Sequence, residues 1–104
     1  MKSLLISMLL KNLIKDISKN KKNITVSGLS TNSKEIKKNF IFFAIRGSKF
    51  NGEKFIKEAV YKGASVIVCS KSCKIKNNRI LIIKTNNIRH LLSDVASKFY
   101  KSKP

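Results

Sequence analysis

A strand, a loop, a helix and a second strand follow one another in the middle of the chain, and this order constrains the fold most. Residues 40–45 (FIFFAI) form an apolar run that is too short for a helix and typical of a buried strand. Asn51 or Gly52 can then begin a helix, and Gly63 is the predicted C-cap of this helix. The apolar side chains on one face of this helix are Phe55, Ile56, Ala59 and Val60. Residues 64–69 are again strand-like, which predicts a βαβ unit with its crossover.

Further elements are predicted on both sides of this unit. Residues 24–26 begin a short β-rich segment, and residues 80–83 (ILII) form another buried strand. Residues 88–100 carry the cleanest amphipathic helical pattern, with Asn87 as a good N-cap. A length of 104 residues fits one domain. We therefore predict a single α/β domain over residues 1–104, with a mixed sheet of four to five short strands and flanking helices.

The N-terminus has features of a signal peptide and of a helix. Residues 1–10 are charged and then apolar, but Lys11 follows at once and no small-residue cleavage site is present. Apolar residues continue at helical spacing at Ile6, Leu10, Leu13 and Ile17. This pattern predicts an amphipathic helix that faces the core. Since no apolar run approaches the roughly 18 residues that span a membrane, we expect a cytoplasmic protein with no membrane partner.

The chain is strongly basic, with 23 Lys and Arg, 5 Asp and Glu and a net charge of +18. This balance is typical of proteins that bind nucleic acid or anionic membranes, and a small basic nucleic-acid-binding protein is an outside alternative. The lysines, however, run through every segment rather than along one face. Their abundance beside Asn, Ile and Phe fits the codon bias of an AT-rich genome, so we expect no specific nucleic-acid partner.

Residues for metal binding and catalysis are sparse. Cys69 and Cys73 have no second cysteine pair, and His90 is the one histidine, whereas zinc sites usually need four ligands in paired spacing. We expect two free thiols and no metal. None of the four glycines precedes a Lys-Ser/Thr pair, so a phosphate-binding P-loop is absent. The five carboxylates are scattered, and we predict no catalytic residues and no cofactor for this chain.

Two polar segments have the composition of a nucleotide site. Residues 30–33 (STNS) follow a predicted strand, where hydroxyl and amide groups can bind phosphate oxygens. Residues 47–50 (GSKF) offer a flexible backbone, a hydroxyl, a cation and an aromatic face beside a helix start. A nucleoside diphosphate needs these same groups. Alternatively, residues 30–33 only cap a turn and Phe50 only packs on the following helix.

Three motifs in this region resemble the N-terminal domain of the Mur ligases. Asn32-Ser33-Lys34 corresponds to a D-S-R triplet, residues 42–47 to F-x-A-x-x-G, and residues 51–59 to D-G-x-x-F/Y-I-x-x-A. Order and spacing match together over roughly residues 24–101. Asn in place of Asp loses a charge, and Lys in place of Arg keeps the charge but loses the bidentate fork. The resemblance is greatest to the ligases that add the third residue to UDP-N-acetylmuramoyl-dipeptide.

This resemblance implies a function in peptidoglycan biosynthesis. In these ligases the N-terminal domain holds the UDP part of UDP-N-acetylmuramoyl-L-alanyl-D-glutamate. Carried over, the UDP-binding candidates are Thr31, Ser33, Ser48, Lys49 and Phe50. ATP and Mg are expected only in a full-length enzyme, whose ATP-binding and C-terminal domains are absent from this chain. The chain ends about where a linker would lead into the ATP-binding domain, and the sister ligase that adds D-Ala-D-Ala is an alternative.

Overall fold

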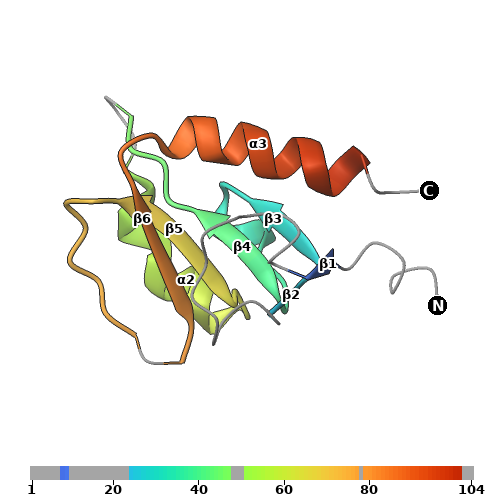
Figure 1. Cartoon of the computed structure of the whole chain (residues 1–104). Helices are drawn as coiled ribbons and strands as arrows, with labels where there is room; N and C mark the ends of the chain where they lie inside the picture. The colour runs from blue at the N-terminus through green and yellow to red at the C-terminus, as the bar shows by residue number, and fades with distance from the viewer. Residues whose placement is uncertain (1–7, 10–23, 48–50, 78, 102–104) are drawn as a thin grey trace.

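A four-stranded parallel sheet forms the centre of the protein (Figure 1). The computed structural model describes residues 8–9, 24–47, 51–77 and 79–101. In sheet order the strands are β3 (Gly28–Ser30), β4 (Phe40–Phe43), β5 (Val66–Ser70) and β6 (Leu81–Thr85). A separate antiparallel ladder joins β1 (Met8–Leu9) to β2 (Thr25–Val26).

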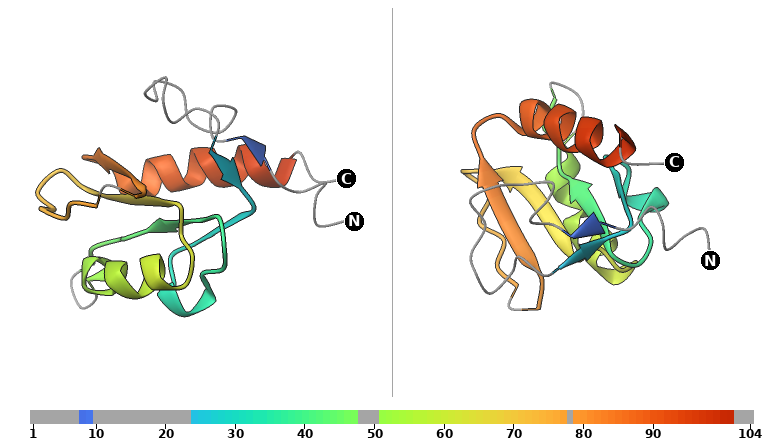
Figure 2. Two further views of the ribbon diagram at one scale, coloured as in Figure 1. Left: turned by 90° about the horizontal axis from the view of Figure 1, so that it is seen from below. Right: turned by 45° about the vertical axis from the view of Figure 1, so that its right-hand side comes forward.

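The helices lie on both faces of this sheet, which gives three layers (Figure 2). The elements are the 3-10 helices η3 (Ser33–Glu35) and η4 (Gly52–Phe55) and the α-helices α2 (Ile56–Tyr61) and α3 (Ile88–Lys101). Side chains of a strand alternate between its two faces. Ile41 and Phe43 of β4 therefore belong to the core on the α3 side, whereas Phe42 packs with Ile56 and Ala59 on the α2 side.

Two glycines fix how the chain turns around α2. Gly63 follows this helix at a φ of +117°, and its carbonyl accepts a 2.8 Å hydrogen bond from the Asn39 amide. Gly52 opens η4, and a Cβ atom there would lie 2.9 Å from the backbone N and O of Ile45. Its amide donates to the Ile45 carbonyl at 2.8 Å. These close approaches bring the start of η4 against the end of β4 and the end of α2 against the segment before β4.

The predicted α/β class, the central βαβ unit and the amphipathic C-terminal helix are all confirmed. Ile41 pairs with Val66 in a parallel register, and α2 connects β4 to β5. All four strands of the main sheet are parallel, and the antiparallel pairing that a mixed sheet would contain lies in the separate β1-β2 ladder. The connection predicted between β5 and β6 contains no helix or strand in its described residues.

The predicted N-terminal helix is wrong at Met8 and Leu9, and the rest of it lies outside the described residues. These two residues form β1, where Met8 pairs with Val26 and Leu9 with Thr25. The apolar side chains have helical spacing, but a distant segment, β2, supplies hydrogen-bond partners for the backbone of β1, and this pairing decides the structure. None of the described helices combines the length and the apolar character needed to cross a bilayer.

Candidate functional site

The loops that leave the carboxyl ends of the strands meet at one edge of the sheet (Figure 1). In parallel sheets, ligands bind in the crevice outside these strand ends. Thr31 and Ser33 follow β3 and lie at this edge, as their positions in the sequence predict. Ser48, Lys49 and Phe50 lie outside the described residues. Arg46 and Asn51 flank residues 47–50 and pair in an isolated antiparallel bridge, so this segment also begins and ends at the carboxyl edge.

A hollow of about 520 Å³ lies beside the end of β3, and we call it the β3 hollow. It is lined by Thr31, Asn32, Ser33, Lys34 and Phe55. Thr31 and Lys34 are exposed, and Phe55 is 37% exposed. The sequence pattern placed Phe55 on the apolar face of its helix with buried Ile56, but the phenyl ring lines the hollow instead. The hollow therefore presents a hydroxyl, an amide, a cation and an aromatic ring.

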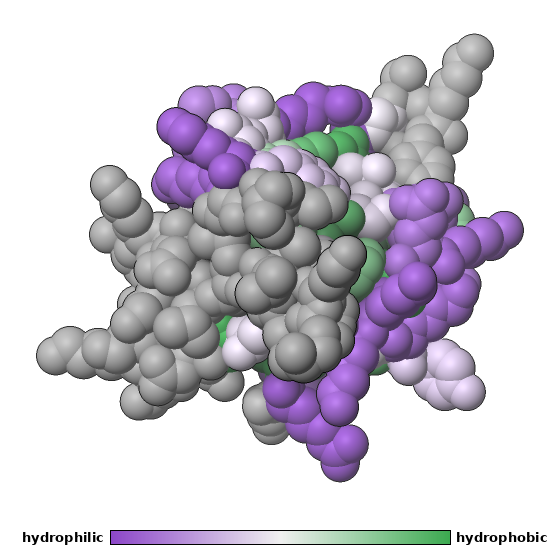
Figure 3. Space-filling model, turned by 90° about the vertical axis from the view of Figure 1, so that its right-hand side faces the viewer, coloured by the Kyte–Doolittle hydropathy of each residue, from purple (hydrophilic) through white to green (hydrophobic). Residues whose placement is uncertain are grey.

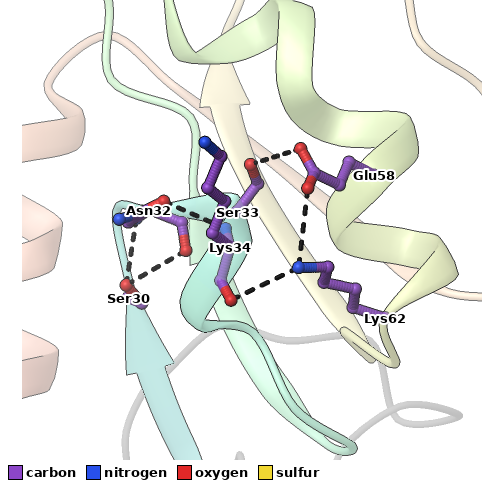
Figure 4. Close-up of polar contacts among 6 residues, drawn as sticks. All are labelled: Ser30, Asn32, Ser33, Lys34, Glu58 and Lys62. Atoms are coloured by element: carbon purple, nitrogen blue, oxygen red, sulfur yellow. Dashed lines mark hydrogen bonds and ion pairs between the residues drawn. The ribbon is translucent and has the colours of Figure 1, made fainter.

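The backbone of this loop is held by short-range hydrogen bonds (Figure 4). The Asn32 side-chain oxygen accepts from the Lys34 amide at 2.9 Å and caps η3. The Ser30 hydroxyl accepts from the Asn32 amide at 2.9 Å and donates to a Glu35 carboxylate oxygen at 2.9 Å. Asn accepts at an N-cap as Asp would, because its side-chain oxygen has the same position. The exchange of Asp for Asn in the triplet thus keeps the local turn.

Ser33 lines the hollow but is buried, and its hydroxyl contacts helix α2. It is 5% exposed, and its hydroxyl donates to Glu58 Oε1 at 2.9 Å. The other Glu58 oxygen lies 3.5 Å from Lys62 Nζ, which also donates to the Lys34 carbonyl at 3.3 Å (Figure 4). The structure thus gives the Ser33 hydroxyl a protein partner 25 residues away. Its predicted contact with a ligand is untested.

A second carboxylate joins the loops after β4 and β5. Glu53 Oε2 accepts from the Ser70 hydroxyl at 2.6 Å and from the Ser70 amide at 3.3 Å. The Ser70 hydroxyl is 3.0 Å from the Ser72 hydroxyl, which accepts from Arg46 Nη1 at 3.2 Å. This chain of contacts fixes the end of β5 to η4 and to the base of the 47–50 loop.

A smaller hollow of about 220 Å³ lies between the ends of β4, β5 and β6 and the start of α3, and we call it the α3 hollow. Its polar lining residues are Arg46, Ser70, Thr85, Asn86, Asn87 and Arg89. The predicted N-cap is confirmed, since the Asn87 side-chain oxygen accepts from the His90 amide at 3.0 Å. The sequence reasoning missed Arg46 and Thr85 here, although each closely follows a predicted strand.

Metal and thiol chemistry have little support at this edge. The described residues contain no group of three or more His, Cys, Asp or Glu side chains that could hold a metal ion. Cys69 and Cys73 are free, as predicted, and both are buried. Burial, followed by the hydrogen bond from Cys73, raises the pKa of the Cys69 thiol to about 12. Since the thiolate is the reactive form, Cys69 is a packing residue.

Family and sequence comparisons place the chain among known ligases. The model described as "Mur ligase family, catalytic domain" matches residues 25–100. The chain is 32% identical to a UDP-N-acetylmuramoyl-L-alanyl-D-glutamate--2,6-diaminopimelate ligase of Clostridium acetobutylicum, over 92% of this chain and 20% of the relative. It is 40% identical to the corresponding ligase of Clostridium tetani, over 89% and 20%. The chain therefore spans about one fifth of the length of these curated relatives.

Solved structures of related ligases share the fold. A MurF ligase from Thermotoga maritima, solved in complex with ADP, superposes with a TM-score of 0.56 and 29% identity over 65% of this chain and 15% of that chain. A MurF from Acinetobacter baumannii gives a TM-score of 0.61 over 81% of this chain and 17% of that chain. At 17% identity, the second likeness concerns the fold alone.

Proposed function

The chain belongs to the Mur ligase family, and from this we propose that it is the UDP-binding domain of a UDP-N-acetylmuramoyl-tripeptide synthetase. In this role it anchors the UDP part of UDP-N-acetylmuramoyl-L-alanyl-D-glutamate during peptidoglycan synthesis. The names of the curated relatives support a ligase that acts on this dipeptide. The sister ligase that adds D-Ala-D-Ala is the second candidate, because the similar solved structures are MurF enzymes.

The β3 hollow is the observation that carries this proposal. It combines two residues of the family triplet, Ser33 and Lys34, with the Phe55 ring in a volume of about 520 Å³. A diphosphate is recognised by cations and by N–H and O–H donors, and a base by a flat apolar surface. Lys34 and Thr31 provide the first kind of group and Phe55 the second. Ser48, Lys49 and Phe50 are proposed to complete the site from the neighbouring loop.

Charge around the hollow indicates which side the phosphates occupy. Two unit charges 4 Å apart interact by about 4 kcal/mol at an effective dielectric constant near 20. A phosphate beside Lys34 would therefore be attracted, whereas the charges of Glu58 and Lys62 offset each other at 3.5 Å. We place the diphosphate toward Lys34 and the uracil ring toward Phe55.

We propose that ATP and Mg bind to other domains of a full-length enzyme. The sequence contains no P-loop, and the described residues offer no cluster of metal ligands. Phosphorylation of the substrate carboxylate and attack by an amino acid are therefore assigned to the other domains of a full-length enzyme. This domain contributes affinity for the nucleotide end of the substrate.

Calorimetric titration of the 104-residue chain with UDP tests the proposal. We expect one binding site and, for Lys34→Met, an affinity reduced roughly tenfold, since hydrogen bonds to charged groups contribute about 1.5–3 kcal/mol. Lys101→Met is the matched control, because it removes an exposed lysine at the last residue of α3. Failure to bind both UDP and the UDP-muramoyl-dipeptide would refute the proposal. Sequence-selective nucleic-acid binding at physiological ionic strength would favour the basic-protein alternative.

A further inference from the structure

Most of the carboxylates that the structure describes accept hydrogen bonds from serines at the carboxyl edge of the sheet. The described residues include four carboxylates, Glu35, Glu53, Glu58 and Asp94. The first three accept hydrogen bonds from Ser30, Ser70 and Ser33 respectively. Asp94 instead pairs with Lys98 on the surface of α3. Most acidic groups among the described residues thus hold loops that follow strands.

Ser33 is the most buried of these three serines. Ser33 is the one buried polar residue in the part of the chain that the structure describes. Glu58 lies on α2, and its near neighbours Ile56 and Ala59 are 1% and 0% exposed, so core packing fixes the position of the helix. The 2.9 Å hydrogen bond therefore attaches the loop after β3 to a rigid element.

We propose that Glu58 positions the loop after β3 for the UDP ligand by accepting a hydrogen bond from the Ser33 hydroxyl. Ser33 is then a positioning residue and not a donor to phosphate. This inference rests on the proposed function and identifies how part of that site is held in shape. Lys62 supports the arrangement, because its ammonium group contacts both Glu58 and the Lys34 carbonyl.

The chemistry of the hydroxyl separates this role from direct phosphate binding. A serine hydroxyl has one proton to donate. Glu58 accepts the hydrogen bond that this proton makes, and an ionised diphosphate offers acceptors alone, so one hydroxyl cannot donate to both. The Glu58 charge would also oppose a second anion at the same oxygen. A ligand beside this loop would instead contact the groups that the Ser33–Glu58 contact holds in place, including Thr31 and Lys34.

A set of variants tests this inference by UDP titration. Ser33→Ala removes the donor and Glu58→Met removes the acceptor, and each should weaken UDP binding roughly three- to tenfold, as expected for one hydrogen bond. The double variant should bind UDP at least as tightly as the single variant of lower affinity, because both changes break the same contact. Glu58→Gln keeps an acceptor oxygen and should stay within about twofold of wild type. Asp94→Asn controls for the change in net charge and should leave affinity unchanged.

The outcomes separate this inference from the proposed function. If the wild-type chain binds neither UDP nor the UDP-muramoyl-dipeptide, the proposed function fails. If it binds UDP, and Ser33→Ala weakens binding while Glu58→Met leaves it unchanged or strengthens it, Ser33 contacts phosphate directly and the inference is wrong. Equal affinity of all folded variants would also overturn it. Thermal unfolding of each variant gives the folded fraction, so a loss of stability alone is not mistaken for a loss of affinity.

Discussion

Glu53 and Glu58 belong to consecutive helical segments, and both attach a loop at the carboxyl edge of the sheet, but they do so with different strength. Glu53 accepts two hydrogen bonds from Ser70, one of them at 2.6 Å. Glu58 accepts one from Ser33 and has an exposed ion pair with Lys62. Glu53 thus holds both the backbone and the side chain of Ser70, whereas Glu58 and Lys62 hold the loop after β3 at the Ser33 side chain and at the Lys34 backbone carbonyl.

The β3 hollow and the α3 hollow differ in volume. The α3 hollow measures about 220 Å³ and adjoins the Glu53–Ser70–Ser72–Arg46 contacts. The β3 hollow measures about 520 Å³ and is lined by the loop that Glu58 and Lys62 hold at Ser33 and Lys34. The larger of these two hollows is thus the one in the proposed ligand site. The fixed partner of the loop after β3 is α2, so both loops depend on the segment that begins at Gly52.

Gly52→Ala should have the largest effect, because it disturbs the start of that shared segment. The added Cβ atom would lie 2.9 Å from the backbone of Ile45, which cannot move without shifting β4. We expect a loss of about 3 kcal/mol in the free energy of unfolding, at the upper end for overpacking, measured by urea denaturation. Lys54→Ala, an exposed change in the same 3-10 helix, should cost less than about 0.5 kcal/mol. Equal losses for both variants would show that Gly52 is not sterically required.

Glu53→Met should have the next largest effect. It leaves the Ser70 hydroxyl and amide without their acceptor, and a part-buried polar group without a partner costs about 1–3 kcal/mol. We expect a loss of about 2 kcal/mol in unfolding free energy, against about 1 kcal/mol for Glu58→Met, which affects one hydroxyl. Denaturation of both variants under the same conditions measures the difference. A larger loss for Glu58→Met would reverse the comparison between the two loops.

Elements set by local patterns were predicted well from the sequence. The apolar run of β4 and the helical spacing of α3 each depend on residues within one segment, and both were found at the expected places. The position of Thr31 and Ser33 at the end of a strand was also predicted. These features depend on spacing and turn residues, which are visible in a single sequence.

Side-chain contacts between distant segments were not predicted. Ser33 and Glu58 are 25 residues apart, and Glu53 and Ser70 are 17 apart, so no local period relates them. Phe55 shows the same limit, because its spacing fits the buried face of α2 but its place at the first turn leaves it partly exposed. Which serine meets which carboxylate depends on how helices and strands pack, and packing is a property of the whole fold.

Lys62→Met should have the smallest effect and distinguishes the two attachments of the β3 loop. The Lys62 and Glu58 side chains are 35% and 36% exposed, so solvent screens their ion pair. The hydrogen bond to the Lys34 carbonyl is also exposed. We therefore expect a loss of about 0.5 kcal/mol or less in unfolding free energy.

The consequence for the loop is measured by amide hydrogen exchange of Lys34 and Glu35 in the free protein. If Ser33 and Glu58 provide the main attachment, exchange at these amides should rise more in Glu58→Met than in Lys62→Met, because the contact between Ser33 and Glu58 survives the second change. Lys101→Met should leave both amides unchanged. Faster exchange in Lys62→Met than in Glu58→Met would mean that the surface lysine, and not the buried hydroxyl, holds the loop. The loop after β3 would then be attached less firmly, relative to the loop after β5, than the hydrogen-bond distances indicate. An exposed contact opens more readily than a buried one.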